Sequence, residues 1–171
     1  VTEGSNNVPK VLVVGANIGG AIAAGDLAAQ GWDVTLIERD LKRKKLCGGA
    51  IPPKAMSEFG IPDGIIERKT TRAVVIGPSG SEVSMDVRGT KPHDDEYIIM
   101  VTREVLDRTL RGKAENAGAQ LREAAYVSQE AQPGGKVRVR IRYRDEREEF
   151  ITCDALIGAD GSLLGIGSLV L

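Results

Sequence analysis

The sequence has 171 residues, with 23 lysines and arginines against 24 aspartates and glutamates, so its formal net charge is −1. That balance gives no overall attraction to nucleic acid or to an anionic membrane, and such a partner would need a local basic patch. A hydrophobic fraction of 42% with 27% charged residues excludes a disordered chain and a multi-span membrane protein.

The polar residues 1–9 are predicted to be an N-terminal tail, and the absence of an initiator Met suggests a processed or trimmed end. No apolar run reaches the roughly 18 to 20 residues of a transmembrane helix. Cys47 and Cys153 have no metal-ligand spacing, so we expect reduced thiols and no metal site.

The first predicted elements are a strand, a glycine-rich turn, a helix and a second strand. Residues 10–14 and 33–37 are short apolar runs rich in β-branched residues, as expected for strands buried on both faces. Between them, the alanine-rich residues 20–30 predict a helix that ends at Gly31. This order and length indicate one parallel βαβ unit.

The later elements are mostly strands. Val137 to Tyr143 alternates apolar residues with arginines, the clearest period-2 pattern in the chain, and Glu146, Glu148 and Glu149 are placed for cross-strand pairing with those arginines. In chain order, the further predictions are a loop over 41–54, a hairpin of 73–76 and 83–87, a strand over 97–101, a helix from Thr102 to Asn116, a strand over 148–153 and a buried strand over 154–158.

We therefore predict an α/β fold, a Rossmann-like dinucleotide-binding domain with a parallel sheet and an antiparallel β annex. The domain covers residues 10–171, and segments 70–101 and 136–153 form the β-rich annex.

The glycine-rich turn, residues 15–20, is the first candidate site. In a dinucleotide-binding loop the first glycine makes the turn, the second lets the backbone approach the pyrophosphate, and the third lets helix and strand pack. Gly15 and Gly20 occupy the first and third positions. Glu38, at the end of the next strand, is placed to accept hydrogen bonds from ribose hydroxyls.

Asn17 stands where the second glycine is expected. Its side chain intrudes on the space of the pyrophosphate, although Asn tolerates positive φ well enough for the turn to survive. Two alternatives follow: a loop that binds a dinucleotide, and a βαβ unit that keeps the turn but has lost the ligand.

Nearly the whole chain resembles the plant and cyanobacterial geranylgeranyl reductases, which are similar in turn to flavin monooxygenases of the p-hydroxybenzoate hydroxylase type. The segments that carry the resemblance are Val13-Val14-Gly15 with Gly19-Gly20, Leu36-Ile37-Glu38-Arg39, Lys45-Leu46-Cys47-Gly48-Gly49-Ala50-Ile51-Pro52, Lys91-Pro92-His93, Tyr97-Ile98-Ile99-Met100-Val101, Arg103-Glu104-Val105-Leu106-Asp107 and Ile157-Gly158-Ala159-Asp160-Gly161.

The resemblance implies an FAD-containing, NADPH-dependent reductase that converts geranylgeranyl to phytyl chains for chlorophyll and tocopherol, at the chloroplast thylakoid. It assigns Gly15, Asn17, Gly20, Glu38 and Arg39 to the loop and strand end that hold the ADP half of FAD. Arg103 would approach the pyrophosphate, Asp160 and Gly161 would form a second dinucleotide contact, and Cys47 would face the flavin as a weak catalytic candidate.

Other residues have simpler interpretations. His93, the only histidine, has no visible partner that would orient it as a general base. The basic run 42–45 could meet a diphosphate or an anionic lipid surface, or be solvated. After Asp160-Gly161 the family pattern is not followed, because this chain continues Ser162-Leu163-Leu164-Gly165.

The relatives continue into a substrate domain that this sequence lacks, so we expect a chain that is truncated relative to the family and catalytically incomplete by itself. One hypothesis is the FAD-binding portion of a geranylgeranyl reductase, with an isoprenoid substrate only when complete. The alternative is a cofactor-free degenerate relative, a pseudoenzyme acting as a structural or assembly subunit of a larger thylakoid complex. The second hypothesis predicts an exposed apolar contact surface, including residues 163–171.

Overall fold

The computed structural model describes residues 8–86 and 97–161. The chain divides into two compact units, one formed by Val1–Arg43 with Asp107–Leu171 and the other by Lys44–Leu106. The residues His93 and 163–171, singled out from the sequence, lie outside the described part of the chain.

The first unit is built on a four-stranded parallel sheet in the order β12-β1-β2-β8. Its strands are β1 (Lys10–Val14), β2 (Asp33–Glu38), β8 (Gln120–Glu123) and β12 (Ala155–Gly158). The central strands are almost completely buried, with Leu12, Val13, Leu36 and Ile37 at 0% exposure. This burial on both faces explains why their sequences are continuous apolar runs.

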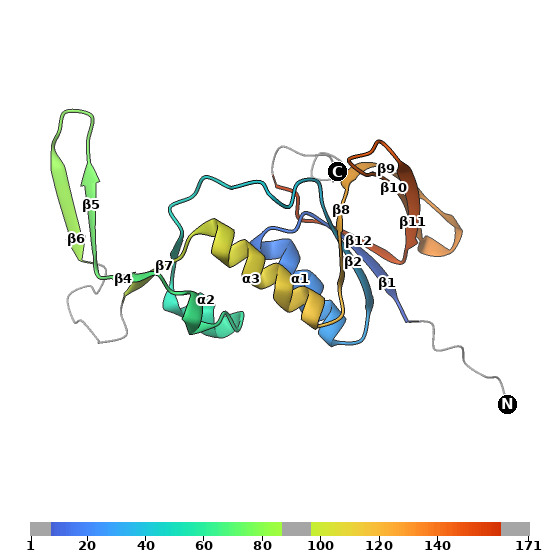
Figure 1. Ribbon diagram of the computed structural model, residues 1–171, viewed down its shortest axis with the longest axis horizontal. Coiled ribbons are helices and arrows are strands. Elements are labelled where there is room, and N and C mark those ends of the chain that lie inside the picture. Colours follow the sequence, from blue (N-terminus) through green and yellow to red (C-terminus); the bar gives the residue numbers. More distant parts are fainter. Residues whose placement is uncertain (1–7, 87–96, 162–171) are drawn as a thin grey trace. The chain divides into compact units, whose positions relative to one another are not determined.

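Two helices cover one face of this sheet, α1 (Ile18–Ala29) and the part of α3 (Arg103–Asn116) that belongs to the first unit (Figure 1). The helices meet at small residues. A Cβ on Gly25 would lie 3.4 Å from the Cα of Ala114, which is itself fully buried. The alanines and glycines of α1 therefore allow a close helix contact, which compensates for their small individual apolar area.

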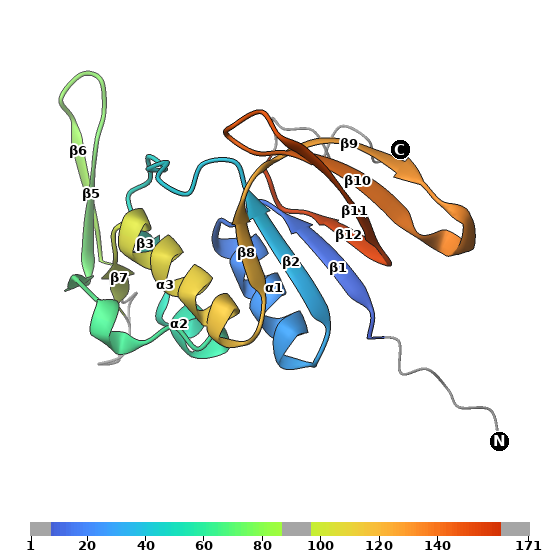
Figure 2. The same ribbon diagram turned by 45° about the vertical axis from the view of Figure 1, so that its right-hand side comes forward.

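A three-stranded antiparallel sheet covers the other face (Figure 2), in the order β11-β10-β9. It consists of β9 (Ala125–Ala131), β10 (Val137–Arg142) and β11 (Glu148–Cys153), and a 3-10 turn, Pro133–Gly135, joins β9 to β10. The core between the two sheets contains Leu12, Val14, Ile37, Ala124, Val139, Ile141 and Cys153.

The arginines of β10 pair across strands, as the sequence predicts. Arg140 and Arg142 form ion pairs with Glu148 at 3.6 and 3.5 Å, and Arg138 pairs with Glu130 of β9 at 3.3 Å. Because Val139 and Ile141 point into the core and are fully buried, the arginines occupy the opposite, outer face.

The second unit contains two small sheets. An antiparallel sheet has the order β3-β7-β4, and β5 and β6 form a separate hairpin. The elements are β3 (Ala50–Ile51), α2 (Pro53–Glu58), the 3-10 turn Asp63–Ile65, β4 (Arg68–Thr70), β5 (Arg72–Ile76), β6 (Glu82–Asp86) and β7 (Ile98–Met100).

One face of the β5–β6 hairpin is entirely apolar. The register pairs Ala73 with Met85 and Val75 with Val83, so these four side chains share a face. Val75, Val83 and Met85 are 49 to 60% exposed. The hairpin is thus held by its own ladder of hydrogen bonds and presents uncovered apolar surface to solvent.

The predicted fold class and the predicted βαβ unit, hairpin and long helix are confirmed. The segment 41–54, predicted to be a loop, contains β3 and the start of α2, and strands β4, β8 and β9 have no counterpart in the prediction. In the described residues, no helix is long and apolar enough to cross a bilayer.

Candidate functional site

The turn after β1 is fixed by two glycines. Gly15 has φ of +100°, and a Cβ there would lie 2.5 Å from the carbonyl oxygen of Ala159. A Cβ on Gly20 would collide with the carbonyl oxygen of Gly15. The Gly15 N–H donates to Ile37 O at 2.8 Å, which ties the turn to β2. Both positions therefore require glycine for the fold itself.

Asn17 is the N-cap residue of α1, and its side chain makes no capping hydrogen bond. Its backbone is extended, with φ of −79° and ψ of −172°, so the tolerance of Asn for positive φ is not needed here. The first turn of α1 contains no acidic residue. The first N–H groups of this helix therefore have no capping side chain and no carboxylate within the first turn itself, an arrangement that leaves them available to an anion.

The carboxylate of Glu38 lies against this turn. Its Oε2 accepts the Ala16 N–H at 3.0 Å and its Oε1 accepts the Asp40 N–H at 3.3 Å. Each carboxylate oxygen has capacity for a further hydrogen bond, which a ribose hydroxyl could supply. Arg39, which follows β2, is exposed.

Asp160 and Gly161 follow β12, whose register with β1 pairs Gly158 with Val14. The Ala159 N–H continues this ladder by donating to Val14 O at 2.7 Å. Since β1, β2 and β12 are parallel, their carboxyl ends bring Gly15, Glu38 and Asp160 to one edge of the sheet. Gly161 has φ of +93°, as suits the end of this turn.

Tyr126 of β9 is a further residue near this edge, since it feels the charge of Asp160. Burial raises the pKa of its phenol, and the negative charge of Asp160 raises the pKa further. Because β9 itself was not predicted, no sequence signal placed this ring near Asp160.

In the second unit the structure brings Cys47 and Arg103 together. Cys47 is exposed, whereas Arg103, the first residue of α3, is only 8% exposed. The Gly49 N–H donates to the Cys47 sulfur and lowers the pKa of the thiol, with smaller contributions from Arg103 and Lys45. Gly49 has φ of +72°, and a Cβ there would collide with Val101 O.

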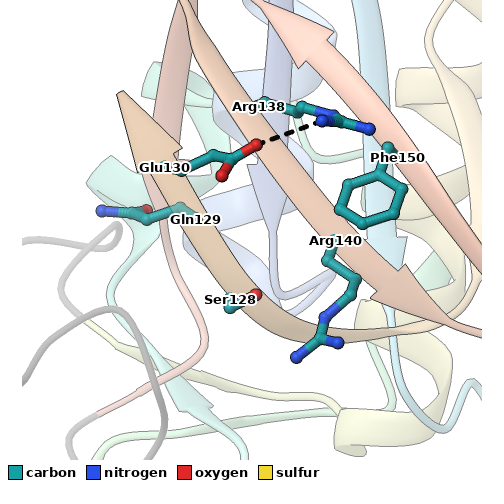
Figure 3. Close-up of a pocket in the computed structure, with 6 residues that line it drawn as sticks. All are labelled: Ser128, Gln129, Glu130, Arg138, Arg140 and Phe150. Atoms are coloured by element: carbon teal, nitrogen blue, oxygen red, sulfur yellow. Dashed lines mark hydrogen bonds and ion pairs between the residues drawn. The ribbon is translucent and has the colours of Figure 1, made fainter. Parts of the chain in front are cut away.

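A different hollow, of about 240 Å³, lies on the outer face of the three-stranded sheet (Figure 3). Arg138 pairs with Glu130 and lies 4.0 Å from the centroid of the Phe150 ring, and Arg140 pairs with Glu148. This face is the one turned away from the parallel sheet, so the hollow is separate from the glycine turn. In the part of the chain that the structure describes, no group of histidine, cysteine or carboxylate side chains could hold a metal ion.

Comparisons with known proteins identify relatives of this chain. The chain is 42% identical over 164 residues to the chloroplastic geranylgeranyl diphosphate reductase of Oryza sativa subsp. japonica, covering 90% of this chain and 34% of that protein. It is 35% identical over 162 residues to the geranylgeranyl diphosphate reductase of Synechocystis, covering 91% of this chain and 39% of that protein. The chain thus spans little more than a third of the length of these relatives.

The fold also matches a solved structure, a geranylgeranyl bacteriochlorophyll reductase-like protein from Thermoplasma acidophilum. The TM-score is 0.75 at 24% identity, covering 90% of this chain and 39% of that one. The family model described as "FAD binding domain" matches residues 9–163, which include the glycine turn, Glu38 and Asp160. The chain therefore belongs to the FAD binding domain family.

Proposed function

We propose that this chain binds the ADP half of FAD at the carboxyl edge of its parallel sheet. The observation that carries the proposal is the uncapped start of α1 beside the Glu38 carboxylate, which accepts the Ala16 N–H of the glycine turn at 3.0 Å. Helix N–H groups would bind the pyrophosphate, and Glu38 would accept from the ribose hydroxyls.

The other site residues extend this proposal. Asp160 and Gly161 would form the second dinucleotide contact, Arg39 would support the ribose end, and Arg103 would donate to the pyrophosphate as a charged donor. Asn17 is the unfavourable element, because its side chain adds volume where the backbone of the turn would approach the phosphates.

In the longer relatives the domain serves a reductase, and we propose the same class of activity for the complete protein that contains this chain. FAD would supply hydride transfer, with NADPH as reductant and a geranylgeranyl chain as acceptor, for phytyl synthesis at the chloroplast thylakoid. The residues of this chain would bind and orient the cofactor. The Cys47 thiol, whose pKa is lowered, would be the candidate catalytic group on the flavin side.

A flavin titration tests the binding proposal. The purified chain is mixed with FAD, and the quenching of flavin fluorescence is followed. Glu38→Gln should weaken binding about tenfold or more, because a hydrogen bond to a charged acceptor is lost. Glu115→Gln, an exposed carboxylate at the end of α3, is the matched control and should bind as the unchanged chain does. A chain that shows no saturable binding of FAD would refute the proposal.

One observation favours the alternative of a cofactor-free assembly subunit. On the apolar face of the β5–β6 hairpin, Val75 is 54% exposed and Val83 is 60% exposed, and such surface is typical of protein contacts. The alternative predicts self-association or capture of a partner without flavin. Size-exclusion chromatography with light scattering tests it, and a monodisperse monomer that binds FAD would exclude it.

A further inference from the structure

The segment between β2 and β3 carries four consecutive basic residues followed by an uncovered leucine. Lys42, Arg43, Lys44 and Lys45 are all exposed. Leu46 is 99% exposed, compared with 64% for Ile76, the next highest among the exposed large hydrophobic residues that the structure describes. Leu46 therefore makes essentially no contact with the rest of the protein and stands next to four cations.

One of the four cations, Lys44, has an acidic partner among the described residues. Lys44 forms an ion pair with Glu104 at 2.8 Å, which raises the pKa of its ammonium group. Within residues 8–86 and 97–161, the side chains of Lys42, Arg43 and Lys45 form no ion pair. The nearest carboxylate in sequence, Asp40, is already engaged, since it accepts the Lys42 N–H at 3.0 Å and pairs with Arg144 at 3.1 Å.

We propose that residues 42–46 dock on an anionic lipid surface. The three unpaired cations would contact the negatively charged headgroups, and Leu46 would enter the boundary between headgroups and acyl chains. The leucine decides the kind of partner, because a phosphate or a nucleic acid would engage the cations but leave Leu46 in water. The proposal does not depend on flavin binding, since none of these residues belongs to the glycine turn or to Glu38.

Flotation of the chain with lipid vesicles tests the proposal. One vesicle is pure phosphatidylcholine, and in the other about a third of the lipid is phosphatidylglycerol, which gives the negative surface potential. We expect binding to the anionic vesicle only, weakening as salt is added. Each basic residue near the surface contributes about fivefold to the affinity for anionic lipid. The triple variant Lys42→Gln, Arg43→Gln, Lys45→Gln should therefore bind the anionic vesicle on the order of a hundredfold more weakly.

A matched triple variant controls for the loss of charge. Lys54→Gln, Arg68→Gln and Arg108→Gln remove three exposed cations elsewhere and should retain most of the binding. Leu46→Ser should weaken binding about tenfold while leaving the salt dependence unchanged.

Three results would overturn the proposal: equal binding to both vesicles, equal losses in the two triple variants, or no binding of the unchanged chain to either vesicle. Because the comparison of the two vesicles uses the unchanged chain, it stays decisive if a variant fails to fold. A parallel FAD titration of the Lys42, Arg43 and Lys45 triple variant should give the same affinity as the unchanged chain, which separates this proposal from the flavin proposal.

Discussion

Gly19 and Gly20 are neighbours in α1, yet the structure predicts opposite effects when each is replaced by alanine. A Cβ on Gly20 would meet the carbonyl oxygen of Gly15 and lie 3.1 Å from the Cβ of Ala159, whereas a Cβ on Gly19 would have nothing within 4 Å. The obstacle at Gly20 is backbone, and Gly15 is held in place by its hydrogen bond to Ile37 O at 2.8 Å. The turn therefore has little room to relax.

The free energies follow from these contacts. Overpacking costs about 1 to 3 kcal/mol, and the rigid obstacle puts Gly20→Ala at the upper end of that range. Alanine gains up to about 1 kcal/mol over glycine within a helix, so Gly19→Ala should be neutral or slightly stabilising. For a chain of this size, about 1 kcal/mol corresponds to roughly 2 to 4 °C in Tm, so Gly20→Ala should lower the Tm by about 4 to 12 °C.

Thermal unfolding followed by far-UV circular dichroism measures both variants against the unchanged chain. The two substitutions add the same methyl group one position apart, so differences in composition or in the unfolded chain are small. If both variants shift the Tm by the same amount, or if Gly20→Ala unfolds at the temperature of the unchanged chain, then the carbonyl of Gly15 does not pack closely against position 20 as the structure predicts.

Three further predictions concern single side chains. Asn17→Gly should strengthen FAD binding about tenfold in the fluorescence titration while costing only a few tenths of a kcal/mol in stability, since no capping bond is lost; unchanged affinity would show that Asn17 is not the obstacle. Cys47 should react with iodoacetamide at neutral pH faster than an ordinary thiol, because its pKa is lowered, and Arg103→Gln should slow the reaction; Cys153→Ser controls for the second thiol. The Lys10 N–H and then the Lys136 ammonium lower the pKa of Asp154, so the stability it contributes should be present above its unfolded pKa and lost as pH falls through the folded pKa; Asp154→Asn should flatten this acid limb in urea titrations at several pH values.

The sequence predicted the elements whose ends are marked by residues with a local requirement. Gly31 ends α1 with φ of +84°, and Gly118 follows α3 with φ of +110°, so both helix stops depend on glycine itself. The strands β1 and β2 are continuous apolar runs because helices and a second sheet cover both of their faces. These features are local, and a single sequence carries them.

The strands that were missed have no such local signal. β8, Gln120–Glu123, has only one apolar residue, Leu121, and it is a strand because it pairs with β2, Leu121 opposite Leu36. β3 has two residues and exists through its pairing with β7. Tertiary pairing decides these segments, so propensity and periodicity do not reveal them.

The candidate site divides in the same way. The sequence identified Gly15, Gly20 and Glu38 from spacing, but the hydrogen bond from the Ala16 N–H to Glu38 and the burial of Arg103 depend on how distant segments meet. The proximity of Tyr126 to Asp160 is a property of the same kind, because the two residues lie 34 positions apart in the sequence.

The two functional hypotheses separate at a single position of the glycine turn. Gly15 and Gly20 are required by packing, so a relative that had lost its cofactor would keep both to preserve the fold. Their presence therefore favours neither hypothesis. Position 17 is different, because its backbone is extended and any residue could occupy it. Binding of FAD by the unchanged chain would show that the Asn17 side chain is accommodated. Binding that appears only in Asn17→Gly would show that the turn, the α1 N-terminus and Glu38 remain competent, and that one side chain accounts for the loss.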